Sequence, residues 1–395
     1  MRNDMRFEKH ILDKKQKLII YGAGGYGELA LRACEQMGLK VYCFVDRNGG
    51  RKKEFLGLPM YDAGELENFQ EDCILIASDD YFNDMYNYAV KCGCETICDI
   101  SLLLEMEIDV NRLSDRAKEK LNTRRNYEAA ICNIQGINIV HMSYSVSERC
   151  TLRCRDCSAL MPYYSRPENI DLVAYKESFD RFLNVVDLIG ELKIYGGEPF
   201  LNPEVYKLLE WYGDHEKIGI ISIYTNGMII PSEKCLEMIK KVPKTKIHIS
   251  DYGDHNRKNA EKMIEILEKN SISYHYRSYE SWQNMGGFNY RGYNEKNLCS
   301  IFDKCFAKKC NHFLKGVFYI CPRQGHAVDL GLIPNEKKDY VDFNDKNCSD
   351  DELKARLEKL LKNKSYIDAC KYCGGMYSHG NEIEPAIQTK TILRV

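Results

Sequence analysis

The chain has 395 residues, of which 44% are hydrophobic and 29% are charged, and its formal net charge at pH 7 is −2. This length predicts two or three domains, and the balance of apolar and charged residues is that of a folded globular protein. A net charge this small gives no electrostatic attraction to nucleic acid or to an anionic membrane, so we expect neither as a partner and favour a small-molecule substrate.

The chain carries no signal for a membrane or for secretion. No apolar run reaches the ~18 residues that cross a bilayer, and residues 1–16 are charged without an apolar secretory core. We therefore expect a cytoplasmic protein. It has 18 cysteines, and in a reducing compartment cysteines serve more often as metal ligands or catalytic thiols than in disulfides. Their spacing is thus the first clue to function.

A glycine-rich loop lies between the first predicted strand, residues 17–20, and a helix that runs to residue 37. The loop has the spacing G-x-G-x-x-G, with Gly22, Gly24 and Gly27. A second strand over 41–45 is followed by Asp46. In such a βαβ unit the glycines let a pyrophosphate approach the helix amino terminus, and the acid can bond a ribose.

Strands predicted over 73–77 and 96–98 extend this unit to a small doubly wound domain, residues 1–105. It resembles the Rossmann-like units of enzymes that make capsule, lipopolysaccharide and other surface sugars. Relatives of that kind bind a nucleotide-sugar or bind nothing. A bound nucleotide or nucleotide-sugar is therefore the favoured interpretation, and a vestigial scaffold and a redox-active NAD site are the alternatives.

Residues 106–136 are charged and helical in pattern, and we interpret them as a helical linker. A second series of alternating strands and helices occupies residues 137–298. Its strands are predicted over 137–145, 192–195, 218–224, 246–250 and 272–276, with amphipathic helices over 175–189 and 260–267. This alternation predicts an α/β fold with a parallel sheet, open or closed into a barrel, whose chemistry gathers at the carboxyl ends of the strands.

A cysteine triad begins where the first strand of this series ends: Cys150, Cys154 and Cys157. Three thiolates on one loop can hold three irons of a cubane [4Fe–4S] cluster and leave the fourth iron without a protein ligand. S-adenosylmethionine can chelate that iron, and electron transfer from the cluster then breaks a carbon–sulfur bond to give a 5′-deoxyadenosyl radical. A structural zinc site is the alternative, because three thiolates at this spacing also suit a tetrahedral metal.

Residues 137–298 resemble the radical S-adenosylmethionine superfamily, of which this triad is the signature. Three further motifs follow successive strands in the family's order: Gly196-Gly197-Glu198-Pro199, Thr225-Asn226-Gly227 and His248-Ile249-Ser250-Asp251. The resemblance implies a partial (β/α)6 barrel in which the first motif receives the methionyl amino group, chiefly at Glu198. It implies ribose and substrate contacts at the other two. Asp156 departs from the family, which often has a bulky residue before the third cysteine.

Residues 299–395 break the strand–helix rhythm and are rich in cysteine. Their pattern resembles a twitch domain, a truncated relative of the SPASM domain, and is carried by Cys305, Gly316, Cys321, Cys370 and Cys373. The resemblance implies a second, auxiliary [4Fe–4S] cluster closed by the four thiolates, which relays electrons, positions substrate or braces the fold. Cys299 or Cys310 is close enough in sequence to replace one ligand, and zinc or free thiols are the alternatives.

The combined resemblance implies a radical enzyme that abstracts hydrogen from a small activated metabolite, and the first domain points to a nucleotide-sugar in surface polysaccharide synthesis. Net dehydrogenation, epimerisation and rearrangement all remain open; in epimerisation Cys310 would return a hydrogen atom. We expect a flavodoxin or ferredoxin-type electron donor. Asp251, Tyr252 and Cys310 are the catalytic candidates, and further candidates facing the substrate are His248, His275, Arg277 and Arg323.

Three other functions compete with this reading. A peptide- or protein-modifying maturase would also carry such a cysteine-rich tail, but it predicts a winged-helix module in place of the glycine-rich domain. A methylating enzyme would release S-adenosylhomocysteine. A non-catalytic protein that binds zinc and nucleotide would be colourless, whereas iron–sulfur clusters are brown.

Overall fold

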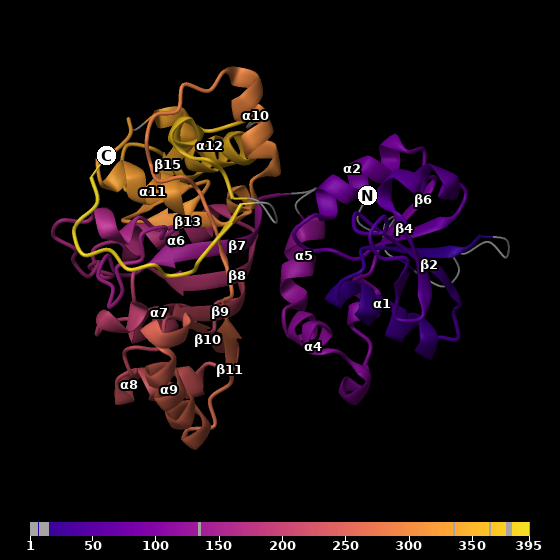
Figure 1. The fold of residues 1–395 in the computed structure, drawn as a ribbon, viewed down its shortest axis with the longest axis horizontal. Coiled ribbons are helices and arrows are strands. Elements are labelled where there is room, and N and C mark those ends of the chain that lie inside the picture. The colour runs from indigo at the N-terminus through magenta and orange to yellow at the C-terminus, as the bar shows by residue number, and fades with distance from the viewer. Residues whose placement is uncertain are drawn as a thin grey trace. The chain divides into compact units, whose positions relative to one another are not determined.

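The computed structural model describes residue 7 and residues 16–132, 136–334, 336–362, 365–376 and 381–394. The chain divides into two compact units, residues 1–140 and 141–395 (Figure 1). Within the described ranges, no helix combines the length and the apolar character that crossing a membrane requires.

The first unit is built on a six-stranded mixed sheet in the order β3-β4-β2-β1-β5-β6. The strands are β1 (Leu18–Tyr21), β2 (Val41–Asp46), β3 (Glu54–Phe55), β4 (Leu58–Asp62), β5 (Cys73–Ile76) and β6 (Thr96–Asp99). The helices are α1 (Gly25–Gln36), η3 (Ala63–Phe69), α2 (Phe82–Lys91) and α3 (Ser101–Leu104). All pairings are parallel except β3 with β4, which confirms the doubly wound arrangement.

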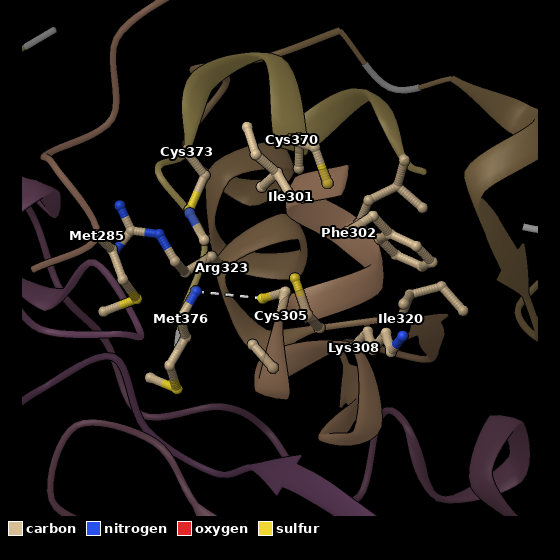
Figure 2. Close-up of a pocket in the computed structure, with 15 residues that line it drawn as sticks. Met285, Ile301, Phe302, Cys305, Lys308, Ile320, Arg323, Cys370, Cys373 and Met376 are labelled. Atoms are coloured by element: carbon tan, nitrogen blue, oxygen red, sulfur yellow. Dashed lines mark hydrogen bonds between the residues drawn. The ribbon is translucent and has the colours of Figure 1, made fainter. Parts of the chain in front are cut away.

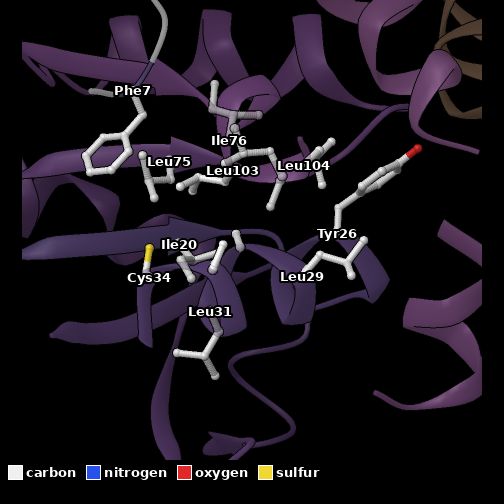
Figure 3. Close-up of a cluster of buried hydrophobic side chains, with 14 of the residues drawn as sticks. Phe7, Ile20, Tyr26, Leu29, Leu31, Cys34, Leu75, Ile76, Leu103 and Leu104 are labelled. Carbon is white, nitrogen blue, oxygen red and sulfur yellow. The ribbon is translucent and has the colours of Figure 1, made fainter. Parts of the chain in front are cut away.

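The central strands of this sheet are uninterrupted apolar runs because both of their faces are covered. All four residues of β1 and of β5 are buried. On one face, Ile20 and Leu75 pack with Leu29 of α1 and Leu103 of α3 (Figure 3). A strand buried on both sides leaves no room for the polar alternation of a half-exposed strand.

The predicted linker consists of η4 (Val110–Arg112), α4 (Asp115–Asn122) and α5 (Arg124–Cys132), and these elements pack on the first unit. The hydroxyl of Tyr127, a fully buried residue, donates to the carbonyl of Ile76 at 2.5 Å and accepts from the amide of Ile100 at 2.9 Å. Ser114 caps α4 and bonds the carboxylate of Glu28. The segment therefore completes the core of the domain it follows.

The second unit contains an eight-stranded sheet in the order β11-β10-β9-β8-β7-β13-β14-β15. Its strands are β7 (Asn138–Ser145), β8 (Leu188–Tyr195), β9 (Ile218–Thr225), β10 (Thr245–Asp251), β11 (Tyr274–Ser278), β13 (Asn311–Leu314), β14 (Val317–Tyr319) and β15 (Tyr340–Asp342). β8 to β11 pair in parallel, as does β13 with β7, whereas β13, β14 and β15 are antiparallel. The predicted parallel sheet of a partial barrel is confirmed.

Helices flank this sheet, and short helical turns lie in the connections between its strands and helices. They are η5 (Met161–Tyr163), α6 (Lys176–Val185), η6 (Pro199–Leu201), α7 (Tyr206–Tyr212), α8 (Glu233–Lys241), η7 (Gly253–His255), α9 (Arg257–Lys269), α10 (Glu295–Lys304), η8 (Phe306–Lys309), α11 (Pro322–Asp329), η9 (Lys337–Asp339), α12 (Asp350–Lys362) and η10 (Asp368–Tyr372). β12 (Trp282–Gln283) and β16 (Glu382–Ile383) form a separate two-stranded pair.

The strands of the partial barrel alternate between an apolar and a polar face. On β10, Ile247 and Ile249 are buried, whereas His248 and Ser250 between and after them are partly exposed. Helices α7, α8 and α9 lie on one side of β9 to β11 (Figure 1). Because successive side chains of a strand point to opposite faces, the polar residues share the face away from the apolar layer.

The cysteine-rich region continues the barrel sheet. β13 pairs with the outer edge of β7, with Phe313 opposite Tyr144 in register. Phe313 is fully buried and packs on Tyr144 and on Phe179 of α6, with ring centroids 5.4 and 5.1 Å apart. Gly316 forms the turn into β14 at φ +80°, a conformation that favours glycine. The hairpin thus covers an edge that the barrel would otherwise leave open.

Replacing Phe313 by Ala should lower the free energy of unfolding by about 3–5 kcal/mol, because it empties a buried aromatic site at the β7–β13 junction. Anaerobic urea unfolding of the full chain measures the effect. Phe306→Ala removes an exposed ring of the same size and serves as the control. Equal stability of the two variants would show that β13 is not part of the shared core.

Candidate functional site

The cysteine triad lies on the loop that follows β7. Cys154 is buried, and Cys150 and Cys157 are partly buried. The amide of Leu152 donates to Sγ of Cys150 at 3.5 Å, and Nδ2 of Asn226 lies 3.6 Å from the same sulfur. Amide donors that face sulfur stabilise thiolates and the clusters they ligate.

Burial governs the protonation of these thiols when no metal is bound. It raises the pKa of Cys154 to about 12 and also raises the pKa values of Cys150 and Cys157. Within the described part of the chain, no group of three or more His, Cys, Asp or Glu side chains is arranged to hold a single metal ion. The fit to an iron–sulfur cluster rests on the soft donor set, its apolar surroundings and the amide groups that face it.

The glycine motif after β8 lies directly against the cysteine loop. Gly197 N donates to Ser147 O at 2.7 Å, and Glu198 N donates to Arg149 O at 2.8 Å. A Cβ on Gly197 would stand 2.1 Å from the carbonyl oxygen of Arg149 and 3.1 Å from Cβ of Cys150. Gly196 has φ +154°, and its Cβ would meet Ser147. Only glycine permits this approach, and the structure therefore brings the two predicted motifs together.

Glu198 links the ends of β8 and β9. Its fully buried carboxylate accepts hydrogen bonds from Oγ1 of Thr225 at 2.8 Å and from the amide of Asn226 at 2.9 Å. It also caps η6, which begins at Pro199, through the amide of Phe200 at 3.1 Å. Burial raises the pKa of this carboxyl group to about 7, against the opposing effect of these donors. Asn226 in turn contacts Thr151 and Cys150, so the carboxylate holds the Thr225-Asn226-Gly227 motif in place beside the triad.

The catalytic candidates of β10 differ in their surroundings. Asp251 is buried and accepts hydrogen bonds from Tyr276 at 2.6 Å, from Arg257 at 3.1 Å and from the amide of Gly253 at 2.8 Å. Although its burial acts in the opposite direction, these donors lower the pKa of Asp251. The carboxylate therefore ties β10 to β11 and to α9.

Tyr252 lies beside the triad and Ser250. It packs in an apolar cluster with Leu152, Cys154 and Ala386, and its ring centroid is 5.2 Å from that of Trp282. Burial raises the pKa of Tyr252 well above its ordinary value, an effect that a hydrogen bond with Ser250 opposes. This tyrosine is neutral near pH 7 and has a place next to the cysteine loop.

The remaining candidates of the barrel lie along its polar face. His248 stacks on Tyr224, with ring centroids 4.5 Å apart, and its centroid is 5.5 Å from that of His275. Burial lowers the pKa of His248 to about 4, so the imidazole is neutral at physiological pH. Arg277 is exposed over the ring of Tyr279. His248 is thus the best enclosed of the three residues that were predicted to face a substrate.

The four predicted auxiliary ligands meet around one cavity of about 30 Å³ (Figure 2). They are Cys305, Cys321, Cys370 and Cys373. Backbone amides donate to two of the sulfurs, from Met376 to Cys305 at 3.3 Å and from Gly375 to Cys373 at 3.4 Å. Among the described residues that line this cavity, neither Cys299 nor Cys310 occurs. The arrangement fits a site closed by four thiolates.

Arg323 connects the two cysteine groups. It is 5% exposed, lines the auxiliary cavity, lies over the ring of Phe288 at 5.3 Å and donates to the carbonyl oxygen of Gly287. Its charge also acts on the triad, where it opposes the effect of burial on the pKa of Cys157. Burial raises the pKa of Tyr195, at the end of β8, and the thiols of Cys157 and Cys310 act in the same direction.

The first unit has a separate cavity of about 390 Å³ at its glycine loop. Gly22, Gly24 and Asp46 line it, as predicted, and Gly27 packs so closely on the carbonyl of Gly22 that a Cβ would clash at 2.1 Å. The carboxylate of Asp46 accepts a hydrogen bond from the amide of Ala23 at 3.0 Å, so the acid also braces the loop.

Besides Arg47, two cationic residues line this cavity that no sequence pattern predicted. Arg116 and Lys120 reach it from α4, which had been interpreted as a linker. Arg116 lies over Gly24, and Lys120 pairs with Asp79 at 2.7 Å. No local motif marks these positions, since only the packing of α4 on α1 brings them to the loop.

Comparison with known proteins assigns two parts of the chain. Residues 144–269 match the model of the radical SAM superfamily, and residues 14–97 match the C2185-like, N-terminal model. The part of the chain that matches the radical SAM superfamily model contains the triad and the three strand-end motifs.

Curated relatives match about a quarter to a third of this chain. The GTP 3′,8-cyclase of Clostridium acetobutylicum is 31% identical over 116 residues, 29% of this chain and 35% of the cyclase. That of Desulforamulus reducens is 34% identical over 99 residues, 23% of this chain and 28% of the cyclase. The chain thus spans about a third of the length of these relatives. The crystal structure of BtrN with AdoMet and 2-DOIA is 14% identical, with a TM-score of 0.42, and covers 61% of this chain and 95% of BtrN.

Glu198 should make stability depend on pH. Because its pKa in the folded chain is raised to about 7, the stability contributed by its proton is complete below the unfolded-state pKa of about 4.3 and is lost as pH rises through about 7. A glutamine at this position cannot ionise. Glu198→Gln should therefore remove a loss on the order of 3 kcal/mol in the free energy of unfolding over this pH range. Urea unfolding at several pH values tests this, with the exposed Glu210→Gln as control. A wild-type profile that Glu198→Gln leaves unchanged would refute it.

Proposed function

We propose that the chain is a radical S-adenosylmethionine enzyme that abstracts hydrogen from a small activated metabolite, a nucleotide-sugar used in surface polysaccharide synthesis. The observation that carries the proposal is the triad of Cys150, Cys154 and Cys157 on a loop whose preceding residues, Ser147 and Arg149, accept backbone hydrogen bonds from the motif after β8. When bound there, a [4Fe–4S] cluster with S-adenosylmethionine supplies a 5′-deoxyadenosyl radical.

The chain's own residues would position the bound groups and exclude water from them. Leu152, Tyr252 and Trp282 surround the cysteine loop with apolar surface, which excludes water. Glu198 fixes the end of β9 and thereby holds Asn226 against Cys150. The polar face of the barrel, with His248 as its enclosed neutral imidazole, offers hydrogen bonds to a substrate.

Features of each unit, taken separately, favour a substrate that contains a nucleotide. The cavity of the first unit is lined by a glycine loop, three cationic side chains and four aspartates, and of these the loop amides and Arg116 suit a diphosphate best, since Lys120 is paired with Asp79. Arg323 offers a buried cation between the two cysteine groups, and a buried charge is costly unless an anion meets it. The relatives of the radical SAM domain are named as acting on GTP, a nucleotide.

The four cysteines of the auxiliary cavity would hold a second [4Fe–4S] cluster with no open iron. Such a cluster can accept an electron from a substrate radical, and the outcome is then net dehydrogenation. A hydrogen atom returned by the thiol of Cys310 would instead complete an epimerisation and leave a thiyl radical, which one electron from the protein donor and a proton would convert back to the thiol. Rearrangement is the third outcome. A flavodoxin or ferredoxin-type protein would deliver the electron that starts the reaction.

The triad can be tested by anaerobic reconstitution with iron, sulfide, dithionite and S-adenosylmethionine. The wild-type chain should release 5′-deoxyadenosine, and sugar nucleotides should stimulate its formation. Cys154→Ala should release none, because two thiolates cannot retain the cluster. Cys235→Ala removes a buried thiol of α8 and serves as the control. Product formation by Cys154→Ala would refute the assignment.

The auxiliary site predicts a different pattern of loss. Cys373→Ala should lower the cluster iron to about half of the wild-type content while 5′-deoxyadenosine is still formed without substrate, because the triad keeps its own cluster. Iron analysis and product chromatography measure the two effects. Cys299→Ala is the matched control, since this cysteine lies nearby in sequence but does not line the cavity. Full iron content in Cys373→Ala would contradict a cluster closed by Cys373.

A further inference from the structure

The carboxyl-terminal segment 384–389 lies against the cysteine loop, although more than half of the chain separates them in sequence. The amide of Arg155 donates to Ile387 O and that of Thr389 donates to Arg153 O, both at 2.7 Å. Cys154 and Gln388 form an antiparallel bridge. In Figure 1 the yellow trace of this region runs extended across the second unit. The segment therefore pairs with the loop by its backbone, like a short strand.

The side chain of Gln388 contacts the same loop with both ends of its amide. Oε1 accepts a hydrogen bond from the amide of Arg153 at 2.6 Å, and Nε2 donates to Sγ of Cys154 at 3.3 Å. Nε2 also donates to the carbonyl of Ala386 at 2.5 Å. A flipped amide would lose all three bonds, so the N–H group is held toward the sulfur.

Packing holds the rest of this segment in place. Ala386 is fully buried at φ +53° and packs with Leu152 and Cys154, with Trp282 beside them. Upstream, Ile383 pairs with Trp282 in the β12–β16 ladder. A larger side chain at this left-handed, enclosed position would push the segment off the loop.

We propose that residues 384–389 are a structural part of the triad's cluster site and that Gln388 is a positioning residue, which rests on the proposed function. Its N–H group stabilises the thiolate of Cys154 as a cluster ligand. Because reduction adds negative charge to the cluster, a donor aimed at a ligating sulfur favours the reduced form and raises the reduction potential. The segment also removes Cys154 from solvent.

The test compares three variants of the reconstituted full chain with the wild type. Gln388→Met keeps the length of the side chain without its polar groups, and Gln388→Glu keeps the acceptor without the donor. Thr389→Val is the matched control, because the Thr389 hydroxyl is buried without a hydrogen-bond partner in the described structure and its backbone bond to Arg153 is retained.

Two properties are measured for the cluster whose electron paramagnetic resonance spectrum responds to S-adenosylmethionine: its midpoint potential and the rate at which its iron passes to a chelator. In both Gln388 variants the midpoint potential should fall, and iron should pass to a chelator about 10-fold faster, as expected on losing an outer-shell partner. Thr389→Val should behave as the wild type does.

Gln388 variants that match the wild type in both properties would overturn the inference. Equal changes in Thr389→Val would also overturn it, because they would show that the segment acts by packing alone. A wild-type chain whose spectrum does not respond to S-adenosylmethionine would overturn the proposed function along with it.

Discussion

The backbone contact between Gly196-Gly197 and the cysteine loop is the constraint on which the candidate site depends. Two hydrogen bonds join the end of β8 to Ser147 and Arg149, at a distance that any side chain on Gly197 would prevent. The next residue, Glu198, reaches on to the end of β9. One short segment, Gly196 to Glu198, therefore positions the cysteine loop, the end of β8 and the end of β9 relative to one another.

Local sequence patterns were enough to predict most of this arrangement. The apolar runs of β1 and β5 and the strand–helix alternation after residue 137 report burial directly, because period and burial are linked in regular structure. The motifs after β8, β9 and β10 were expected together because parallel strands end at one edge of a sheet. The four auxiliary cysteines share one cavity, and it was the resemblance to a twitch domain that suggested grouping them.

What the sequence did not reveal depends on contacts between distant segments. Arg116 belongs to a segment that the sequence pattern predicts to be a linker. It reaches the glycine loop only because α4 packs on α1. Gln388 has no motif around it, and its role appears only when the carboxyl-terminal segment pairs with Arg153 and Arg155. Likewise, a carboxylate such as Asp251 looks reactive at a strand end, whereas its three donors show that it ties elements together.

The pairing of β13 with β7 has a consequence for electron movement. Neighbouring strands of one sheet are about 4.8 Å apart and do not slide past one another while the ladder is intact. Cys305 comes shortly before β13 and Cys321 shortly after β14, whereas the triad follows β7, so cysteines of both groups are attached to one sheet. An electron that passes between groups bound at the two sites would thus cross one continuous sheet and not a flexible connection between domains.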